Sequence, residues 1–467
     1  MFLNRLLAKN NAYKLLLISV CFALYFVFAY ALKRTEYVKL IVLYSSLFAT
    51  FYFMLKTFKN NFYVLVFVAF LSRFVFILAI PNLSQDFYRF IWDGRILLEG
   101  INPYLNTVTS FISKGVYPVS QSQVLYEGMG PLNAGHFTNY PPINQLCFFI
   151  AALFSGKSIL GAAMVFRLLI ICADFGTLYF GKKILEHLNL SVYNIFWYLL
   201  NPFIIIELTG NLHFEGVMIF FLIWSLYLLL IGKWQWSAVV LALSISVKLI
   251  PLIFLPLFFK FFVFKDDTSN SSKKYWIGVK KLIIFYAITL CSTLILFAPF
   301  FSLEFVNNYA QTVKLWFQNF EFNASIYYVA RAIGYTFRGY NEIGVIGKIT
   351  PIVVVLFILI KSFFGKTKSF SGLITAMLIG LSFYFFTTTT VHPWYVATLL
   401  ILSVFTNYKF PLVWSFVIIL SYLAYINIDK ADKSENLWII AIEYIIVYAV
   451  LIWDIIKQKT SKSLNYS

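Results

Sequence analysis

The chain alternates long apolar runs with short polar tracts, and this pattern predicts helices that cross a membrane. The first three runs cover residues 13–32, 38–55 and 62–80. Each is close to the length of about 20 apolar residues that a helix needs to span a bilayer. Arg5, Lys9 and Lys14 lie at the start of the first run, which is too long for the apolar core of a signal peptide. We therefore expect a retained first helix whose N-terminus is cytoplasmic.

The rest of the chain repeats the pattern. Further runs lie at residues 160–180, 192–209, 214–231, 237–247, 249–264, 282–300, 343–360, 371–386, 396–405, 412–426 and 437–456. With a shorter run at 143–154 they predict an all-α polytopic membrane protein, a bundle of about 13 to 15 hydrophobic segments. We expect the shorter run to insert only partly or at a tilt. A full crossing would place Lys182 and Lys183 outside, against the preference of basic residues for the cytoplasm.

Residues 82–140 form the first long polar segment. Glycines and prolines break it repeatedly, and residues 86–99 have the pattern of a short interfacial helix. Tyr140-Pro141-Pro142 then fixes how the chain re-enters an apolar run. We predict one integral membrane domain over residues 1–467. Its parts are N-terminal helices (1–81), an extracytoplasmic catalytic loop (82–140), central helices (141–300), a second extracytoplasmic segment (301–342) and C-terminal helices (343–467).

Charge and composition support this interpretation. The chain is 61% hydrophobic with a formal net charge of +18. In a soluble protein this charge would suggest nucleic-acid binding. We exclude that function because the basic tracts lie between apolar runs, where they set the topology and contact anionic lipids. Four such tracts are predicted on the cytoplasmic side, at residues 265–281, 361–368, 409 and 457–462. The polar segments 82–140, 211–215, 302–340, 387–395 and 429–435 are then predicted on the outer side.

Ionisable residues cluster at the start of the first loop. Asp86, Arg89, Asp93 and Arg95 follow directly on apolar sequence, and a helix would place the first three on one stripe. Charges held near hydrocarbon are costly, so they indicate a functional site. The alternative is a helix-end salt bridge beside an aromatic belt.

Other polar residues are predicted on the same face. His213 and Glu215 belong to a turn, Lys248 lies near a helix end, and His392 and Trp394 stand in a His-Pro-Trp-Tyr sequence. Each histidine also has a structural interpretation: an interfacial hydrogen bond for His213, and the aromatic start of a helix for His392.

A few charges lie inside predicted spans. They are Arg73, Arg167, Asp174 and Glu443. Arg167 and Asp174 are seven residues apart, so we expect them to pair with each other or with a neighbouring helix. The same charges leave a transport function open.

The motifs, taken in order, resemble a known family. They are Asp-x-x-Arg-x-x-x-Asp-Gly-Arg from Asp86, Gly-x-Asn-Pro-Tyr, Tyr-Pro-Pro, an Asn-Pro helix, Gly-Asn-x-His-x-Glu, Val-Lys-Leu-x-Pro and His-Pro-Trp-Tyr. This order resembles the GT-C glycosyltransferases, and within them the polyprenol-phosphate-mannose-dependent mannosyltransferases, over about residues 86–395. The resemblance implies a polyprenyl-phosphate sugar donor, an active site at the outer membrane surface, and a base in the first loop, which Asp86 matches.

These implications agree with the chemistry of the reaction. A phosphate is a fair leaving group, so the enzyme needs a base for the acceptor hydroxyl and cations for the phosphate. We expect Asp86 to be the base. Residues expected to bind the donor phosphate or the substrates are Arg89, Asp93, Arg95, Tyr140, His213, Glu215, Lys248, His392 and Trp394. No metal or other cofactor is required, although a divalent ion held by Asp86 and Asp93 stays open.

We therefore predict a glycosyltransferase that moves a hexose, by resemblance mannose, to a glycan or lipid-linked hydroxyl acceptor at the outer face. The expected location is a bacterial inner membrane, since no retention signal occurs at the end of the chain. The alternative is a secondary transporter or a flippase of lipid-linked sugars. It is disfavoured because the polar residues gather on one face. The same polar cluster argues against a purely structural scaffold.

Overall fold

A computed structural model describes residues 11–264, 272–427 and 435–464. In this part of the chain the secondary structure is helical, with one isolated bridge between Phe322 and Thr390 and no strand. Seven helices are long and apolar enough to cross a membrane, and a bent pair of helices adds an eighth candidate. Seven shorter apolar helices of 10–17 residues accompany them. The predicted all-α polytopic fold is confirmed.

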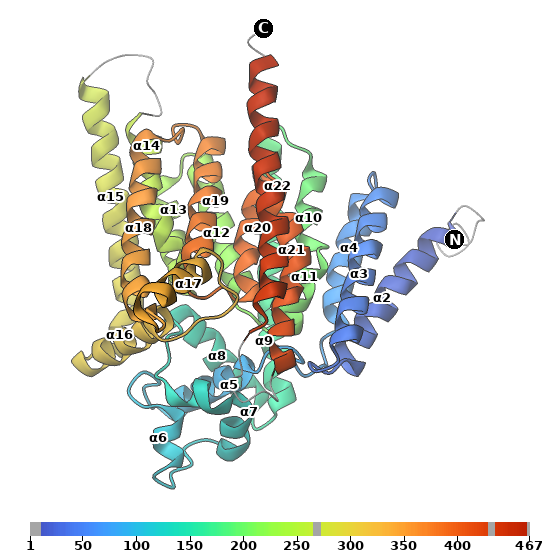
Figure 1. The fold of residues 1–467 in the computed structure, drawn as a ribbon, viewed down its shortest axis with the longest axis vertical. Helices are drawn as coiled ribbons and strands as arrows, with labels where there is room; N and C mark the ends of the chain where they lie inside the picture. Colours follow the sequence, from blue (N-terminus) through green and yellow to red (C-terminus); the bar gives the residue numbers. More distant parts are fainter. Residues whose placement is uncertain (1–10, 265–271, 428–434, 465–467) are drawn as a thin grey trace.

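The N-terminal helices pack beside the bundle, and the loop after them carries further helices (Figure 1). The N-terminal ones are α2 (Ala12–Ala31), α3 (Tyr37–Thr57) and α4 (Phe62–Phe74). The loop region holds α5 (Asp86–Leu98), α6 (Val108–Ile112) and α7 (Ser122–Gly135), and α8 (Pro142–Ser155) follows it. The predicted interfacial helix at 86–99 is thus present as α5.

The central helices run from residue 159 to residue 263. They are α9 (Ile159–His187), η1 (Val192–Ile195), α10 (Phe196–Leu199), α11 (Pro202–Ile204), the π-helix η2 (Ile205–Gly210), α12 (Glu215–Leu230), α13 (Trp234–Ile245), η3 (Ile250–Leu257) and α14 (Phe258–Val263).

The remaining helices complete the bundle and add two amphipathic helices, α16 and α17. They are α15 (Ser272–Phe297), η4 (Ala298–Phe300), α16 (Leu303–Gln318), α17 (Ile326–Arg338), α18 (Ile343–Phe364), α19 (Phe370–Thr387), η5 (Pro393–Tyr395), α20 (Val396–Val404), α21 (Phe410–Val417), η6 (Ile418–Asn427) and α22 (Leu437–Leu464).

The described parts of the basic tracts meet at one end of the bundle. Lys260 Nζ donates to the Gly365 carbonyl, and the Lys409 and Phe410 amides donate to Asp454 near the end of α22. Helices α5, α6 and α7 lie at the opposite end (Figure 1). The predicted polar and basic faces are therefore separate. Residues 265–271 of one tract and 429–434 of one predicted outer segment lie outside the described residues.

Helix α8 is short for a crossing. Its 14 residues are about 21 Å long, less than the hydrocarbon thickness of about 30 Å. The next helix, α9, ends beside the start of α4, where Lys182 Nζ lies 5.0 Å from the centre of the Phe62 ring. Lys182 therefore lies at the same end of the bundle as the start of α4, and the partial insertion of residues 143–154 stays a prediction.

Helix α5 packs closely on α8 because Gly94 lacks a side chain. A Cβ at this position would lie 2.1 Å from the Phe148 carbonyl oxygen. The glycine lets two backbones approach, and so it anchors the first loop on the membrane helices.

Two buried arginines satisfy carbonyl groups around a broken helix. The chain bends by 50° between residues 192–199 and 202–210, where Pro202 cannot donate a hydrogen bond. Arg73 donates to the Leu199 carbonyl, and Arg167 donates to the carbonyls of Thr209 and Gly210. Irregular backbone at membrane depth needs such internal partners.

Arg167 and Asp174 were expected to pair with each other or with a neighbouring helix, and their pairing with each other is wrong. Asp174 pairs instead with Arg73 on α4, at 2.7 Å between Nε and Oδ2, and both side chains are fully buried. Arg167 binds carbonyl groups, with a further bond to Ile77 at 3.2 Å. Pairing with a neighbouring helix, the other form of the prediction, holds for Asp174.

Candidate active site

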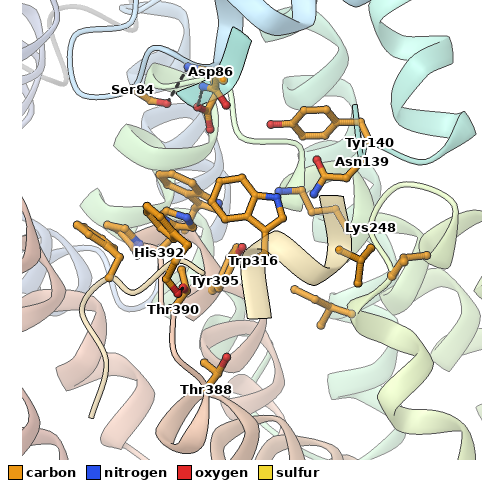
Figure 2. Close-up of a pocket in the computed structure, with 18 of the residues that line it drawn as sticks. Ser84, Asp86, Asn139, Tyr140, Lys248, Trp316, Thr388, Thr390, His392 and Tyr395 are labelled. Atoms are coloured by element: carbon orange, nitrogen blue, oxygen red, sulfur yellow. Dashed lines mark hydrogen bonds between the residues drawn. The ribbon is translucent and has the colours of Figure 1, made fainter. Parts of the chain in front are cut away.

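A cavity of about 550 Å³ opens between the first loop and the bundle. Asp86, Asn139 and Tyr140 line one side, while Trp316 projects into it and His392 lies below (Figure 2). Both predicted extracytoplasmic segments contribute, through residues 83–86 and 132–140 of the first and residues 309–322 of the second.

Hydrogen bonds from α16 hold the two walls together. Tyr309 Oη donates to the Asn139 carbonyl at 3.0 Å, and Thr312 Oγ1 donates to the Phe137 carbonyl at 3.0 Å. On the other side, Thr390 Oγ1 donates to the Phe320 carbonyl at 3.1 Å. The cavity is therefore assembled from segments that are far apart in the sequence.

Asp86 begins α5 and its carboxyl group faces the cavity. Its Oδ1 accepts a 2.9 Å hydrogen bond from Asn133 Nδ2. Burial raises the pKa of Asp86, while the Asn133 hydrogen bond and the charges of Lys248 and Arg34 oppose that rise. A carboxylate with a raised pKa is a better proton acceptor than a solvated one.

Replacing Asn133 by alanine tests this environment. The Asn133 amide stabilises the charged form of Asp86, so its loss will raise the Asp86 pKa further. The carboxylate must be deprotonated to act as a base. We therefore expect the acid limb of the pH profile of kcat/KM to move to higher pH in Asn133→Ala, while activity on the alkaline plateau is largely kept. An unchanged limb would mean that Asp86 does not control it.

Lys248 and Glu215 form an ion pair at the cavity. Lys248 Nζ lies 2.5 Å from Glu215 Oε1, and the Glu215 side chain is fully buried. Lys248 follows the end of α13, and Glu215 begins α12, so two helix ends bring the pair together. Lys248 lines the cavity. Glu215 holds the Lys248 side chain but does not itself line the cavity.

Aromatic rings stack along the cavity wall. The His213 ring lies 3.6 Å from the Trp394 ring, and the His392 ring lies 4.6 Å from Trp394 on a nearly parallel plane. Burial and the charge of Lys248 lower the pKa of His392 to about 3, and burial also lowers the pKa of His213. Both histidines are therefore neutral near pH 7, and they contribute stacked aromatic rings rather than positive charges.

Asp93 lies in a buried network away from the cavity lining. Its carboxylate accepts hydrogen bonds from Arg89 Nε at 2.8 Å, Thr138 Oγ1 at 2.6 Å and Gln145 Nε2 at 3.0 Å. Arg89 also donates to the carbonyls of Asn133 and His136. This network holds the segment after α7 on α5, and thereby positions Asn133 beside Asp86.

Arg95 is also placed away from the cavity lining. It donates to the Ser120 carbonyl at 2.6 Å and to Gln121 Oε1 at 3.2 Å, which ties the start of α7 to α5. Of the residues predicted to bind substrate, the cavity brings together Asp86, Tyr140, Lys248, His392 and Trp394. His213 and Glu215 support them from behind, whereas Arg89, Asp93 and Arg95 organise the first loop.

Several residues of the cavity were not predicted from the sequence. Arg34 lies in the α2–α3 connection and lines the cavity, as do Asn133, His136 and Trp316. One signal was available for Arg34. The predicted topology places it on the outer side, where a basic residue is against the usual bias. Nothing in the sequence marks Trp316 among 11 tryptophans.

No metal-binding group of three or more His, Cys, Asp or Glu residues occurs in the part of the chain that the structure describes. Asp93 does not share the space that Asp86 faces, because its oxygens are engaged in the network with Arg89, Thr138 and Gln145. The arrangement at the cavity is a carboxylate, two cations and a wall of aromatic rings.

Two comparisons with known proteins each match part of the chain. A family model described as "Alpha-(1->6)-mannopyranosyltransferase, N-terminal domain" matches residues 37–263. A curated relative is "Alpha-(1->6)-mannopyranosyltransferase A" of Mycobacterium tuberculosis (strain ATCC 25618 / H37Rv), 23% identical over 181 residues. These residues are 38% of this chain and 33% of the relative, so the match spans about a third of the relative's length. The family match contains Asp86, Glu215 and Lys248.

Proposed function

We propose that this chain, a GT-C mannosyltransferase-like membrane protein, transfers a mannosyl residue from a polyprenyl-phosphate donor to a hydroxyl acceptor in the cavity beside α5. The observation that carries the proposal is the meeting of one half-buried carboxylate, Asp86, with Lys248 and Arg34 in one cavity. A base and cations are the groups that displacement of a sugar from a phosphate needs.

Asp86 takes the proton of the acceptor hydroxyl. The acceptor oxygen attacks the anomeric carbon, the bond from that carbon to the phosphate oxygen breaks, and the phosphate leaves with the electron pair. A single displacement of this kind inverts the anomeric configuration. Asn133 engages Oδ1 of Asp86, which leaves Oδ2 to receive the proton.

Lys248 and Arg34 face the departing phosphate. Arg89 and Arg95, which we expected in this role, are engaged with carbonyl oxygens and side chains away from the cavity. Lys248 and Arg34 both line the cavity, and the charge of each opposes the rise that burial causes in the pKa of Asp86. Charge that develops on the phosphate oxygens is stabilised best by cations fixed in a water-poor site.

An apolar wall beside Lys248 fits a polyprenyl chain. Leu249, Ile250 and Ile253 line the cavity next to Val354 and Val355 of α18. Val355 is 55% exposed on the outside of the bundle, where a membrane helix contacts lipid. A lipid tail can therefore lie between η3 and α18 while its phosphate reaches Lys248.

The proposed acceptor is a glycan or a lipid-linked sugar, and the proposed location is a bacterial inner membrane with the cavity on the extracytoplasmic side. The separation of the basic tracts from α5, α6 and α7 supports this orientation, because basic tracts favour the cytoplasm. The alternative of a transporter has less support, because Arg73 and Asp174, which could have lined a path, pair with each other inside the bundle.

The test is transfer of radiolabelled mannose from polyprenyl-phosphate-mannose to crude membrane glycans by the purified protein in detergent. A panel of other polyprenyl-phosphate sugars measures donor preference. Wild-type transfer from the mannose donor is the expected result. The proposal fails if no donor of the panel is used while the protein remains folded.

Arg34→Gln tests the phosphate role within the same assay. Loss of a hydrogen bond to a charged group corresponds to about a tenfold to hundredfold loss, and we expect that loss in kcat/KM for the donor. Lys33→Gln is the matched control, since it removes the same charge at the adjacent, exposed position. Equal effects of the two substitutions would show that only the general surface charge matters.

A further inference from the structure

Two buried polar atoms on one wall of the cavity have no hydrogen-bond partner among the described residues. They are Nε2 of His136 and Nε1 of Trp316. His136 is 8% exposed, and both residues line the cavity. A buried polar atom without a partner is costly, so a pair of them on two residues that line one cavity indicates that a ligand completes the site.

The two atoms have opposite hydrogen-bonding character. Burial and the charge of Arg89 lower the pKa of His136 to about 4, so its ring is neutral near pH 7. Nδ1 lies 2.8 Å from the Phe137 carbonyl oxygen and therefore carries the proton, which makes Nε2 an acceptor. The indole Nε1–H of Trp316 can only donate.

The two side chains are held in a fixed relation. Their rings lie 5.4 Å apart in an edge-to-face arrangement. The Thr312 hydrogen bond to the Phe137 carbonyl ties α16 to the residue after His136, and the Thr389 hydroxyl donates to the Trp316 carbonyl at 3.3 Å. A donor and an acceptor are thus preorganised on one wall.

This wall is next to the carboxylate. Asn133, which donates to Asp86, precedes His136 by three residues. Arg89 donates to the carbonyls of both Asn133 and His136, so one side chain fixes the position of the base and of the unpartnered ring. A ligand bound at His136 and Trp316 therefore lies on the side of the cavity where Asp86 removes a proton.

We propose that His136 and Trp316 form the subsite for the acceptor sugar. One hydroxyl of a hexose ring donates to His136 Nε2, and a second hydroxyl accepts from the Trp316 indole N–H. A pyranose suits such a pair because its neighbouring hydroxyls each donate and accept. Its apolar ring face also packs on aromatic side chains such as Trp316. This inference rests on the proposed mannosyl transfer and assigns its acceptor specificity to two residues.

The experiment compares Trp316→Phe and His136→Asn with wild type on octyl α-mannoside and its four monodeoxy derivatives. Phenylalanine keeps an aromatic ring and removes only the donor, while asparagine can keep the bond to Phe137 and removes Nε2. We expect each variant to raise the acceptor KM about tenfold, as for a site that loses one hydrogen bond to a substrate hydroxyl. Cleavage of the donor by water without acceptor should be unchanged.

The deoxy derivatives make the test specific. With the wild-type protein, one derivative should have an acceptor KM about tenfold higher than that of octyl α-mannoside. With Trp316→Phe, the KM of this derivative should rise no further, because the same hydrogen bond is removed from either side. A second derivative should behave in this way with His136→Asn. Trp276→Phe and His187→Asn change exposed residues of the same types and should match wild type.

The proposed subsite would be overturned if the acceptor KM rose equally for all derivatives, or if the variants left it unchanged. Either result is also expected if water binds His136 Nε2 and Trp316 Nε1. If wild type transfers no mannose, the proposed function fails by itself. Calorimetric binding of octyl α-mannoside then decides the subsite. Weaker binding by Trp316→Phe than by Trp276→Phe supports it, and equal binding refutes it.

Discussion

Asp86→Asn is expected to lower mannosyl transfer by about a hundredfold to ten-thousandfold, the usual contribution of a general base. Asparagine has nearly the same shape as aspartate, but its side-chain amide does not accept a proton near pH 7. The Asn133 side chain can keep a hydrogen bond to the amide oxygen, so the fold of the loop should persist. The measurement is the rate of label transfer from polyprenyl-phosphate-mannose at saturating donor, together with donor binding.

The control is Glu99→Gln, which removes a carboxylate from an exposed position just after α5. It should transfer at the wild-type rate. If Asp86→Asn retains full activity with intact donor binding, then Asp86 has only a structural role, and Glu215 becomes the next carboxylate to test. Loss of donor binding in Asp86→Asn would instead assign the residue to ground-state recognition.

Asp174→Ala is expected to destabilise the protein by about 3–5 kcal/mol, because it leaves the guanidinium of Arg73 buried without its counterion. Both side chains are fully buried, and Arg73 also caps the Leu199 carbonyl at the helix break. Disorder at that break would spread to η2 and to the turn that carries His213. The measurement is the unfolding midpoint in detergent, with circular dichroism at room temperature to confirm that helices remain.

The matched control on the same helix is Glu186→Ala. Glu186 pairs with Lys182 and Lys183 in an exposed position, so its removal should cost less than about 1 kcal/mol. Similar losses from both substitutions would contradict the assigned role of the buried pair. In Arg73→Met with Asp174→Leu the charges are gone together, and we expect partial recovery. Recovery stays incomplete since the Leu199 carbonyl then lacks its donor.

Several elements were predictable because they depend on local sequence. Apolar runs long enough to span a bilayer can form little other than helices there, and the periodic pattern at 86–99 reproduced α5 within one residue. The partial insertion at 143–154, which rests on charge bias alone, stays a prediction.

The assignment of side chains to the site was less predictable. Spacing placed Asp86, Arg89 and Asp93 on one stripe, but only the tertiary structure shows that Arg89 and Asp93 point into the loop and bind each other. Periodicity records which face a residue shares, and does not record which neighbour satisfies its charge. Motif order similarly indicated His392 and Trp394, yet gave no sign of their stack with His213.

The sequence by itself determined that this is an all-helical membrane protein with its polar residues concentrated in a few loops, and it singled out Asp86. These features follow from hydrophobic length, charge bias and motif order, which are properties of neighbouring residues. The tertiary structure alone decided that Arg34, Lys248 and Trp316 reach the same cavity. They come from segments more than 60 residues apart, and only the packing of α16 and the α2–α3 connection against the first loop brings them together.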